Sequence, residues 1–122
     1  MSLVFAAGTA AIGLVAAIGH SIVSERAILG PLFAGTPTGI LKSRATRAII
    51  RAVFHMPSVA WAVLGLAVLV ARLHGGDPLL GIVAAIVFAV SGLGNLVALR
   101  RLHFGGLLLL AATALTLADL LA

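Results

Sequence analysis

The stretch LVFAAGTAAIGLVAAIGHSIV, from Leu3 to Val23, decides the fold class of this chain. It consists almost wholly of Ala, Val, Leu, Ile and Gly, and it is about as long as the roughly 20 apolar residues that cross a bilayer as an α-helix. The first charged residues, Glu25 and Arg26, follow directly after it. The stretch therefore predicts a membrane-spanning helix that ends in a polar segment.

Three further apolar runs follow, over residues 52–71, 79–99 and 104–121. The 122-residue chain is 62% hydrophobic and only 9% charged, whereas about 25% of the residues of a soluble domain are charged. The runs also lack the alternation that is typical of transmembrane β-barrels. We therefore expect an all-α integral protein of a bacterial inner membrane. Its single transmembrane domain, residues 1–122, should hold helices over about 3–25, 43–73, 78–99 and 104–121.

The composition excludes several classes of function. Without cysteine, the chain cannot form disulfides, thiolate metal sites or iron–sulfur clusters, and it cannot use thiol catalysis. We interpret the net charge of +5 as a topology signal rather than a sign of nucleic-acid binding. The first residues, MSL, lack the basic region of a secretory signal, so we expect the first run to be a retained span.

Basic residues are distributed unevenly among the connections between the runs. The first and third connections and their flanks hold seven of the eight Lys and Arg residues, and the second connection holds only Arg72. The positive-inside rule then puts the first and third connections in the cytoplasm and both termini outside. Because the second and third connections are short, we expect an up-down-up-down four-helix bundle.

The connections also carry signals for helix ends. Ser43 is a candidate N-cap for the second span, and Asp77 is one for the third, with Pro78 in its first turn. The two glycines of RLHGGDP should end the second span. We expect Pro31 to break the helix in the first connection and Pro57 to kink the second span.

Polar residues gather at the ends of the spans that this topology places on the cytoplasmic side. Three of the four histidines occur there, on three different helices, together with Glu25. We interpret His20, Glu25, His55 and His103 as residues that bind a ligand or metal, with His20 and His55 as the metal ligands. Five further polar residues would support them: Ser21, Ser24, Arg51, Ser58 and Asn95.

The spacing of these residues limits the metal hypothesis. Ser21 and Glu25 are four residues apart and share a helix face, but His20 and Glu25 are separated by about 140° around an ideal helix. They could bind one ion together only where the helix unwinds. Because the chain has no H-x-x-x-H or E-x-x-H motif, a metal site would have to be assembled across helices.

Each of these residues also has a purely structural interpretation. His20 could bond a backbone carbonyl, and Glu25 could form an ion pair with Arg47 or Arg51. Asn95 could form an interhelical hydrogen bond. His103 could contact lipid headgroups, and Trp61 could serve packing alone.

Three functions fit these residues. The first is a binding protein whose polar site holds a metal ion, a haem or a small ligand, since imidazole suits all three. The second is a non-catalytic subunit of a larger membrane complex. Small residues at i and i+4, such as Ala6 with Ala10 and Gly13 with Ala17, would supply the face for a homo-oligomer or a partner.

The third function is a small proton-coupled transporter that acts as an oligomer. The length and the four spans are similar to those of the small multidrug resistance exporters, which work as dimers around a membrane-embedded glutamate in the first helix. In this chain Glu25 stands at the end of the first run, tyrosine is absent, and the single tryptophan is in the second span. An enzyme is the least supported class, because no nucleophile–base pair or pair of carboxylates is visible.

Overall fold

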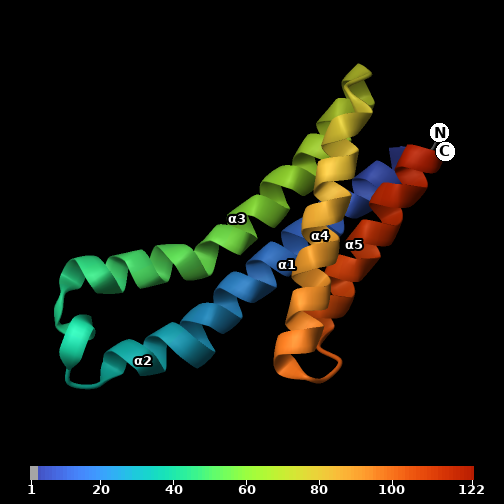
Figure 1. Ribbon diagram of the computed structural model, residues 1–122. Coiled ribbons are helices and arrows are strands. Elements are labelled where there is room, and N and C mark those ends of the chain that lie inside the picture. The colour runs from blue at the N-terminus through green and yellow to red at the C-terminus, as the bar shows by residue number, and fades with distance from the viewer. Residues whose placement is uncertain (1–2) are drawn as a thin grey trace.

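The structure, a computed structural model, describes residues 3–122, and every regular element in that range is helical (Figure 1). Four helical stretches are long and apolar enough to cross a membrane: Leu3–Ala34, Arg44–His74, Pro78–Leu99 and Phe104–Leu121. The predicted all-α fold with four helices of membrane-spanning length and composition is confirmed.

The first stretch is longer than expected. Helix α1 (Leu3–Val23) continues into the π-helical segment η1 (Ser24–Leu29) and then into the short helix α2 (Gly30–Ala34), so the helical path passes residue 25 and ends at Ala34. Pro31 was expected to break the helix. It lies instead in the first turn of α2, and the helical path continues past it. A proline ring clashes with the carbonyl four residues earlier in a regular helix, and we attribute its accommodation here to the wider π turn that precedes it.

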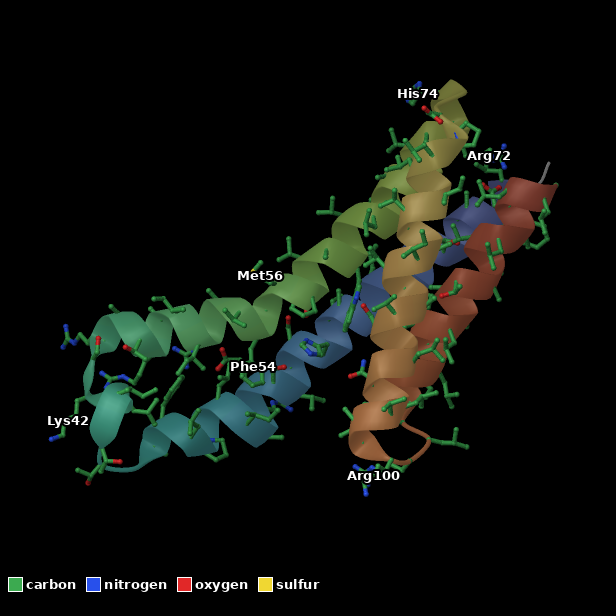
Figure 2. The ribbon with its side chains drawn as sticks, viewed as in Figure 1. Lys42, Phe54, Met56, Arg72, His74 and Arg100 are labelled. Atoms are coloured by element: carbon green, nitrogen blue, oxygen red, sulfur yellow. The ribbon has the colours of Figure 1, made fainter. Side chains whose placement is uncertain are left out.

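Helix α3 (Arg44–His74) follows a single 3-10 turn, η2 (Gly39–Lys42). Ser43 caps it as predicted, because its Oγ accepts a hydrogen bond from the backbone N–H of Thr46 at 3.2 Å. The helix changes direction close to the labelled Met56, next to the internal Pro57 (Figure 2). The segment before this bend, residues 24–56, is called the arm below; it extends away from α4 and α5 (Figure 1).

The connection between α3 and α4 (Pro78–Leu99) has the predicted turn chemistry. Gly75 ends α3 in the left-handed conformation with φ 66°, which glycine adopts without strain. Asp77 caps α4, because its Oδ1 accepts from the backbone N–H of Leu79 at 2.8 Å, and Pro78 begins the helix. Before α5 (Phe104–Leu121), Arg100 is left-handed and His103 is extended.

Helix α1 lies at the centre of the packing and contacts both α3 and α5, while α4 packs mainly on α5. At the α1–α3 crossing the backbones approach closely: a side chain at Gly65 would place its Cβ 3.2 Å from the Cα of Ala10. The buried core consists of Ala6, Ala16, Trp61, Val68, Ala84, Phe88, Leu109 and Ala112.

The small residues of α1 pack inside this single chain. Ala6, Ala10, Gly13 and Ala17 are all buried against its own helices. They therefore do not supply the exposed face on which the homo-oligomer was predicted, and the oligomer stays a prediction without that support.

A buried ion pair joins the ends of α3 and α5. Arg72 Nε donates to Asp119 Oδ1 at 2.9 Å and to Oδ2 at 3.1 Å, and Arg72 Nη2 lies 2.8 Å from Oδ1. One helical turn before Asp119, Thr116 contacts Thr9 of α1 through their hydroxyl groups at 3.2 Å. These contacts fasten three helices together at the end of the bundle that holds both termini (Figure 1).

Candidate functional site

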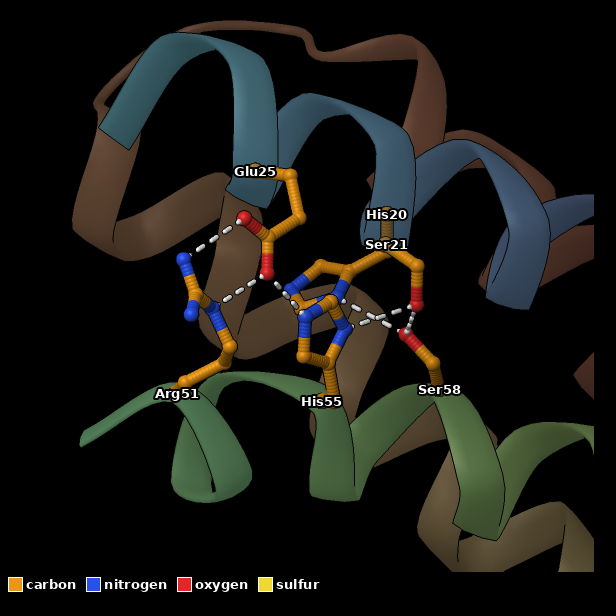
Figure 3. Close-up of polar contacts among 6 residues, drawn as sticks. All are labelled: His20, Ser21, Glu25, Arg51, His55 and Ser58. Carbon is orange, nitrogen blue, oxygen red and sulfur yellow. Dashed lines mark hydrogen bonds and ion pairs between the residues drawn. The ribbon is translucent and has the colours of Figure 1, made fainter. Parts of the chain in front are cut away.

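An ion pair at the base of the arm forms the outer part of the site. Arg51 Nε lies 2.8 Å from Glu25 Oε1, and the ring Nε2 of His55 lies 2.9 Å from the same oxygen (Figure 3). The predicted ion pair of Glu25 with Arg51 is confirmed. Arg47, the alternative partner, instead donates to the carbonyl of Leu41.

Two serine hydroxyl groups continue the contacts inward. His55 Nδ1 lies 3.0 Å from Ser21 Oγ, Ser21 Oγ donates to Ser58 Oγ at 3.0 Å, and Ser58 Oγ lies 3.0 Å from His20 Nδ1 (Figure 3). Glu25, His55, Ser21, Ser58 and His20 therefore form one unbroken hydrogen-bonded chain, called the relay below.

Local helix geometry explains why these five side chains meet. His55 and Ser58 are three residues apart on α3, and Ser21 and Glu25 are four apart on α1 and η1, so each pair shares a helix face. From the sequence, His20 and Glu25 could act together only if the helix unwinds between them. The wider π-helical segment does start at Ser24, between these two residues. The imidazole of His55 and the two serine hydroxyl groups connect Glu25 to His20.

The most exposed residues of the site lie at the outer end of the relay. The side chains of Arg51, Glu25 and His55 are 51%, 38% and 28% exposed, and Ser58 is buried. The relay therefore leads from an exposed ion pair to the half-buried ring of His20. Its only carboxylate, Glu25, already has a counter-charge in Arg51.

The relay can hold its protons in two orders without moving a heavy atom. In the first order, His55 is protonated; it donates to Glu25 and Ser21, Ser21 donates to Ser58, and Ser58 donates to a neutral His20. In the second order, each of the two hydroxyl groups has passed one proton on, so His55 is neutral and His20 carries the charge. One proton thus crosses from one imidazole to the other, and imidazole changes charge near neutral pH.

His20, at the inner end of the relay, also lines a cavity of about 310 Å³ between α1, α3, α4 and the start of α5. Trp61 forms part of the same wall: its ring contacts the ring of His20 edge-on, with centroids 5.1 Å apart. The indole Nε1 donates to Ser91 Oγ at 3.0 Å, which fixes the ring. The remaining wall is mostly apolar: Val15, Ala16, Gly19, Val23, Phe104, Gly105 and Leu108, with the polar Asn95 and His103.

Two residues behave differently from their structural interpretations. His103 lines the cavity, and its ring Nδ1 is buried with no hydrogen-bond partner among residues 3–122. Asn95 lines the same cavity, and within the described part of the chain it forms no interhelical hydrogen bond. Both polar side chains are therefore in place to contact a bound molecule.

Of the other residues predicted to support the site, some belong to the relay or its ion pair and one does not. Ser21, Ser58 and Arg51 belong to the relay or its ion pair, whereas Ser24 is buried in η1 outside the relay. Trp61 was assigned to packing from the sequence, although His55, Ser58 and Trp61 follow one another at intervals of three residues. Ser58 and Trp61 are three residues apart and share a helix face, and this spacing was a signal for the place of Trp61 beside the relay.

The described residues give no support to a metal or haem site. Residues 3–122 contain no group of three or more His, Cys, Asp or Glu side chains that could hold a metal. Both ring nitrogens of His55 are already hydrogen-bonded, and two serine hydroxyl groups bridge His55 to His20. A bis-histidine haem would need those imidazoles on opposite sides of a macrocycle, so the metal and haem hypotheses gain no support.

Compared with protein-family models, with curated proteins and with solved structures, the chain shows no significant match. The function is therefore argued from the geometry of the relay and of the cavity.

Proposed function

We propose that this chain is a membrane protein that binds a small, largely apolar molecule in the cavity beside His20. We also propose that the site exchanges a proton with the cytoplasmic side through the relay. The observation that carries the proposal is the unbroken hydrogen-bonded chain from Glu25 to His20, which ends on the cavity wall. A cavity of about 310 Å³, mostly apolar with a few polar groups, is typical of small-molecule sites.

We infer that the four spans run alternately up and down, with the arm and the relay entrance in the cytoplasm. The bias of Lys and Arg towards the first and third connections supports this orientation. Because the chain has no cysteine, single substitutions test it directly. In sealed cells, a membrane-impermeant maleimide should label His74→Cys from outside, and it should label Thr38→Cys only after the membrane is opened. The reverse pattern would overturn the orientation.

The packing beyond the cavity favours a binding protein over a carrier of protons across the membrane. Phe88 and Leu109 are fully buried between the cavity and the far end of the bundle. Among residues 3–122, no hydrogen bond continues from Trp61 and Ser91 to the pair of Thr9 and Thr116. Proton exchange through this chain is therefore expected on the relay side alone.

Trp61 provides a built-in reporter of cavity binding, because it is the only tryptophan, lies on the cavity wall and is 4% exposed. The protein in nanodiscs would be titrated with 10-bromodecan-1-ol, a neutral apolar probe whose bromine quenches indole fluorescence. We expect quenching that saturates with the mole fraction of probe in the bilayer.

Two glycine variants make the test specific to the cavity. A side chain at Gly19 or at Gly94 meets no atom within 4 Å at its Cβ, but only Gly19 lines the cavity. We expect Gly19→Leu to abolish saturable quenching and Gly94→Leu to retain it. Weak, linear quenching that is the same in the wild type and in Gly19→Leu would contradict the proposed function.

A further inference from the structure

The cavity is open towards the lipid rather than towards water. Three of its wall residues, Val15, Val23 and Phe104, are apolar, and they are 54%, 53% and 72% exposed. On a membrane-spanning helix such exposed apolar side chains contact acyl chains. A molecule that enters between them comes from the bilayer, so it must itself be soluble in lipid.

The polar atoms of the cavity are gathered towards one end of the spans. His20 comes from the last turn of α1, Asn95 from the last two turns of α4, and His103 from the residue before α5. The buried Nδ1 of His103 lacks a partner, which costs free energy unless a ligand or water bonds it. The occupant therefore has a polar head at this end and an apolar remainder towards the lipid.

The charges around the cavity favour an anionic head. No Asp or Glu lines it, and the only carboxylate connected to it, Glu25, is paired with Arg51. Three charged or titratable groups are connected to His20 through the relay: Glu25 from η1, and Arg51 and His55 from α3. In the cavity itself, His103 precedes α5, and α4 contributes only the neutral Asn95. When the relay places its proton on His20, that charge has no counter-ion of its own in the cavity.

We propose that the cavity binds a single-chain lipophilic carboxylic acid, such as a medium-chain fatty acid, with its carboxylate between His20 and His103. This inference rests on the proposed function and specifies its ligand. The acid enters from the bilayer in its neutral form and gives its proton to His20. The proton stays on His20 while the carboxylate is bound, so the total number of protons is conserved and the anionic head lies beside a protonated imidazole.

The test compares two probes with the same chain and the same bromine, 10-bromodecanoic acid and 10-bromodecan-1-ol, by quenching of Trp61 in nanodiscs. The amount of each probe in the bilayer is measured with empty nanodiscs. Because the complex holds a protonated imidazole, acid binding should weaken as pH rises through the imidazole range. We expect the acid to bind at least about tenfold more tightly than the alcohol at about pH 6 and to lose this preference by about pH 8.5.

Two histidine variants separate a specific site from general attraction to the membrane. His103→Gln should reduce the preference for the acid to about threefold or less, because the head loses one of its two imidazole partners. His74 is the last residue of α3 and does not line the cavity, so His74→Gln should leave the preference for the acid unchanged. The ring that contacts Trp61 edge-on is that of His20, so His103→Gln leaves this contact of the reporter in place.

The outcomes separate this inference from the function on which it rests. If the alcohol saturates and the acid binds no better at about pH 6, the carboxylate proposal is overturned and the cavity function survives. If a short-chain benzoquinone displaces the bound alcohol more strongly than the acid does, the carboxylate proposal is overturned and the ligand is a neutral carbonyl compound. If neither brominated probe saturates, both proposals are wrong.

Discussion

The two arginine–carboxylate pairs of this chain lie at opposite ends and differ in their exposure and in their neighbours. Arg72 and Asp119 are 19% and 6% exposed, and the guanidinium meets both carboxylate oxygens. Arg51 and Glu25 are 51% and 38% exposed; this guanidinium also meets both carboxylate oxygens, and a histidine shares the carboxylate with it. The first pair joins the ends of two helices, and the second opens a path into the protein.

This difference shows what each end of the molecule is built to do. A buried ion pair is costly to break by removing one partner, so the Arg72–Asp119 pair holds α3 and α5 in one position. An exposed pair contributes little to stability, since water and salt screen it. The Arg51–Glu25 pair is therefore better explained by its contact with His55 and the relay than by a need for stability.

The largest expected effect is at the buried pair. Asp119→Ala leaves the guanidinium of Arg72 without its carboxylate and should lower the free energy of unfolding by about 3–5 kcal/mol, measured by denaturant titration in micelles. The double variant Arg72→Met with Asp119→Leu should recover most of this loss, because an apolar pair replaces the ion pair. Equal instability of the single and double variants would show that the ion pair is not the cause.

The close crossing of α1 and α3 gives the next effect. Gly65→Val adds atoms where even a Cβ would lie 3.2 Å from the Cα of Ala10, so it should cost about 1–3 kcal/mol in the same titration. Gly94→Val is the matched control, because its Cβ meets nothing within 4 Å. If both valine variants unfold alike, the close backbone approach contributes nothing measurable.

The smallest effect on stability is expected at the exposed pair. Glu25→Gln should shift the unfolding midpoint much less than Asp119→Ala, because the Glu25 side chain remains partly exposed to solvent. The same variant should nevertheless slow proton exchange with the cavity, since the relay loses its outer carboxylate. Asp77→Asn, which preserves the cap of α4, should change neither property. A large loss of stability in Glu25→Gln would make the two ion pairs equivalent.

Much of the fold could be predicted from the sequence, because its signals are local. Long apolar runs, the caps Ser43 and Asp77, and Gly75 at the end of α3 each depend on neighbouring residues alone. The continuation of the first helix past Pro31 could not be predicted in this way. It depends on a π turn, which has no firm sequence signature.

The candidate site was predicted only in part. The residue types and the polar end were identified, and so was the pairing of Glu25 with Arg51. The order of the contacts depends on how α1 and α3 face each other, and helical spacing alone leaves that rotation undetermined. For this reason Ser21 and Ser58 were expected only to support the site, although they bridge its two histidines, whereas His103 lines the cavity beside His20.

The most direct test of the relay is a rapid pH jump followed through the fluorescence of Trp61, whose ring touches that of His20. Protonated imidazole quenches indole emission, so the signal reports the arrival of a proton at His20. We predict that Ser58→Ala, which removes the hydroxyl group next to His20, slows the response by about tenfold or more relative to the wild type, while Ser43→Ala does not. Equal rates in the wild type and in Ser58→Ala would contradict a relay through the serines.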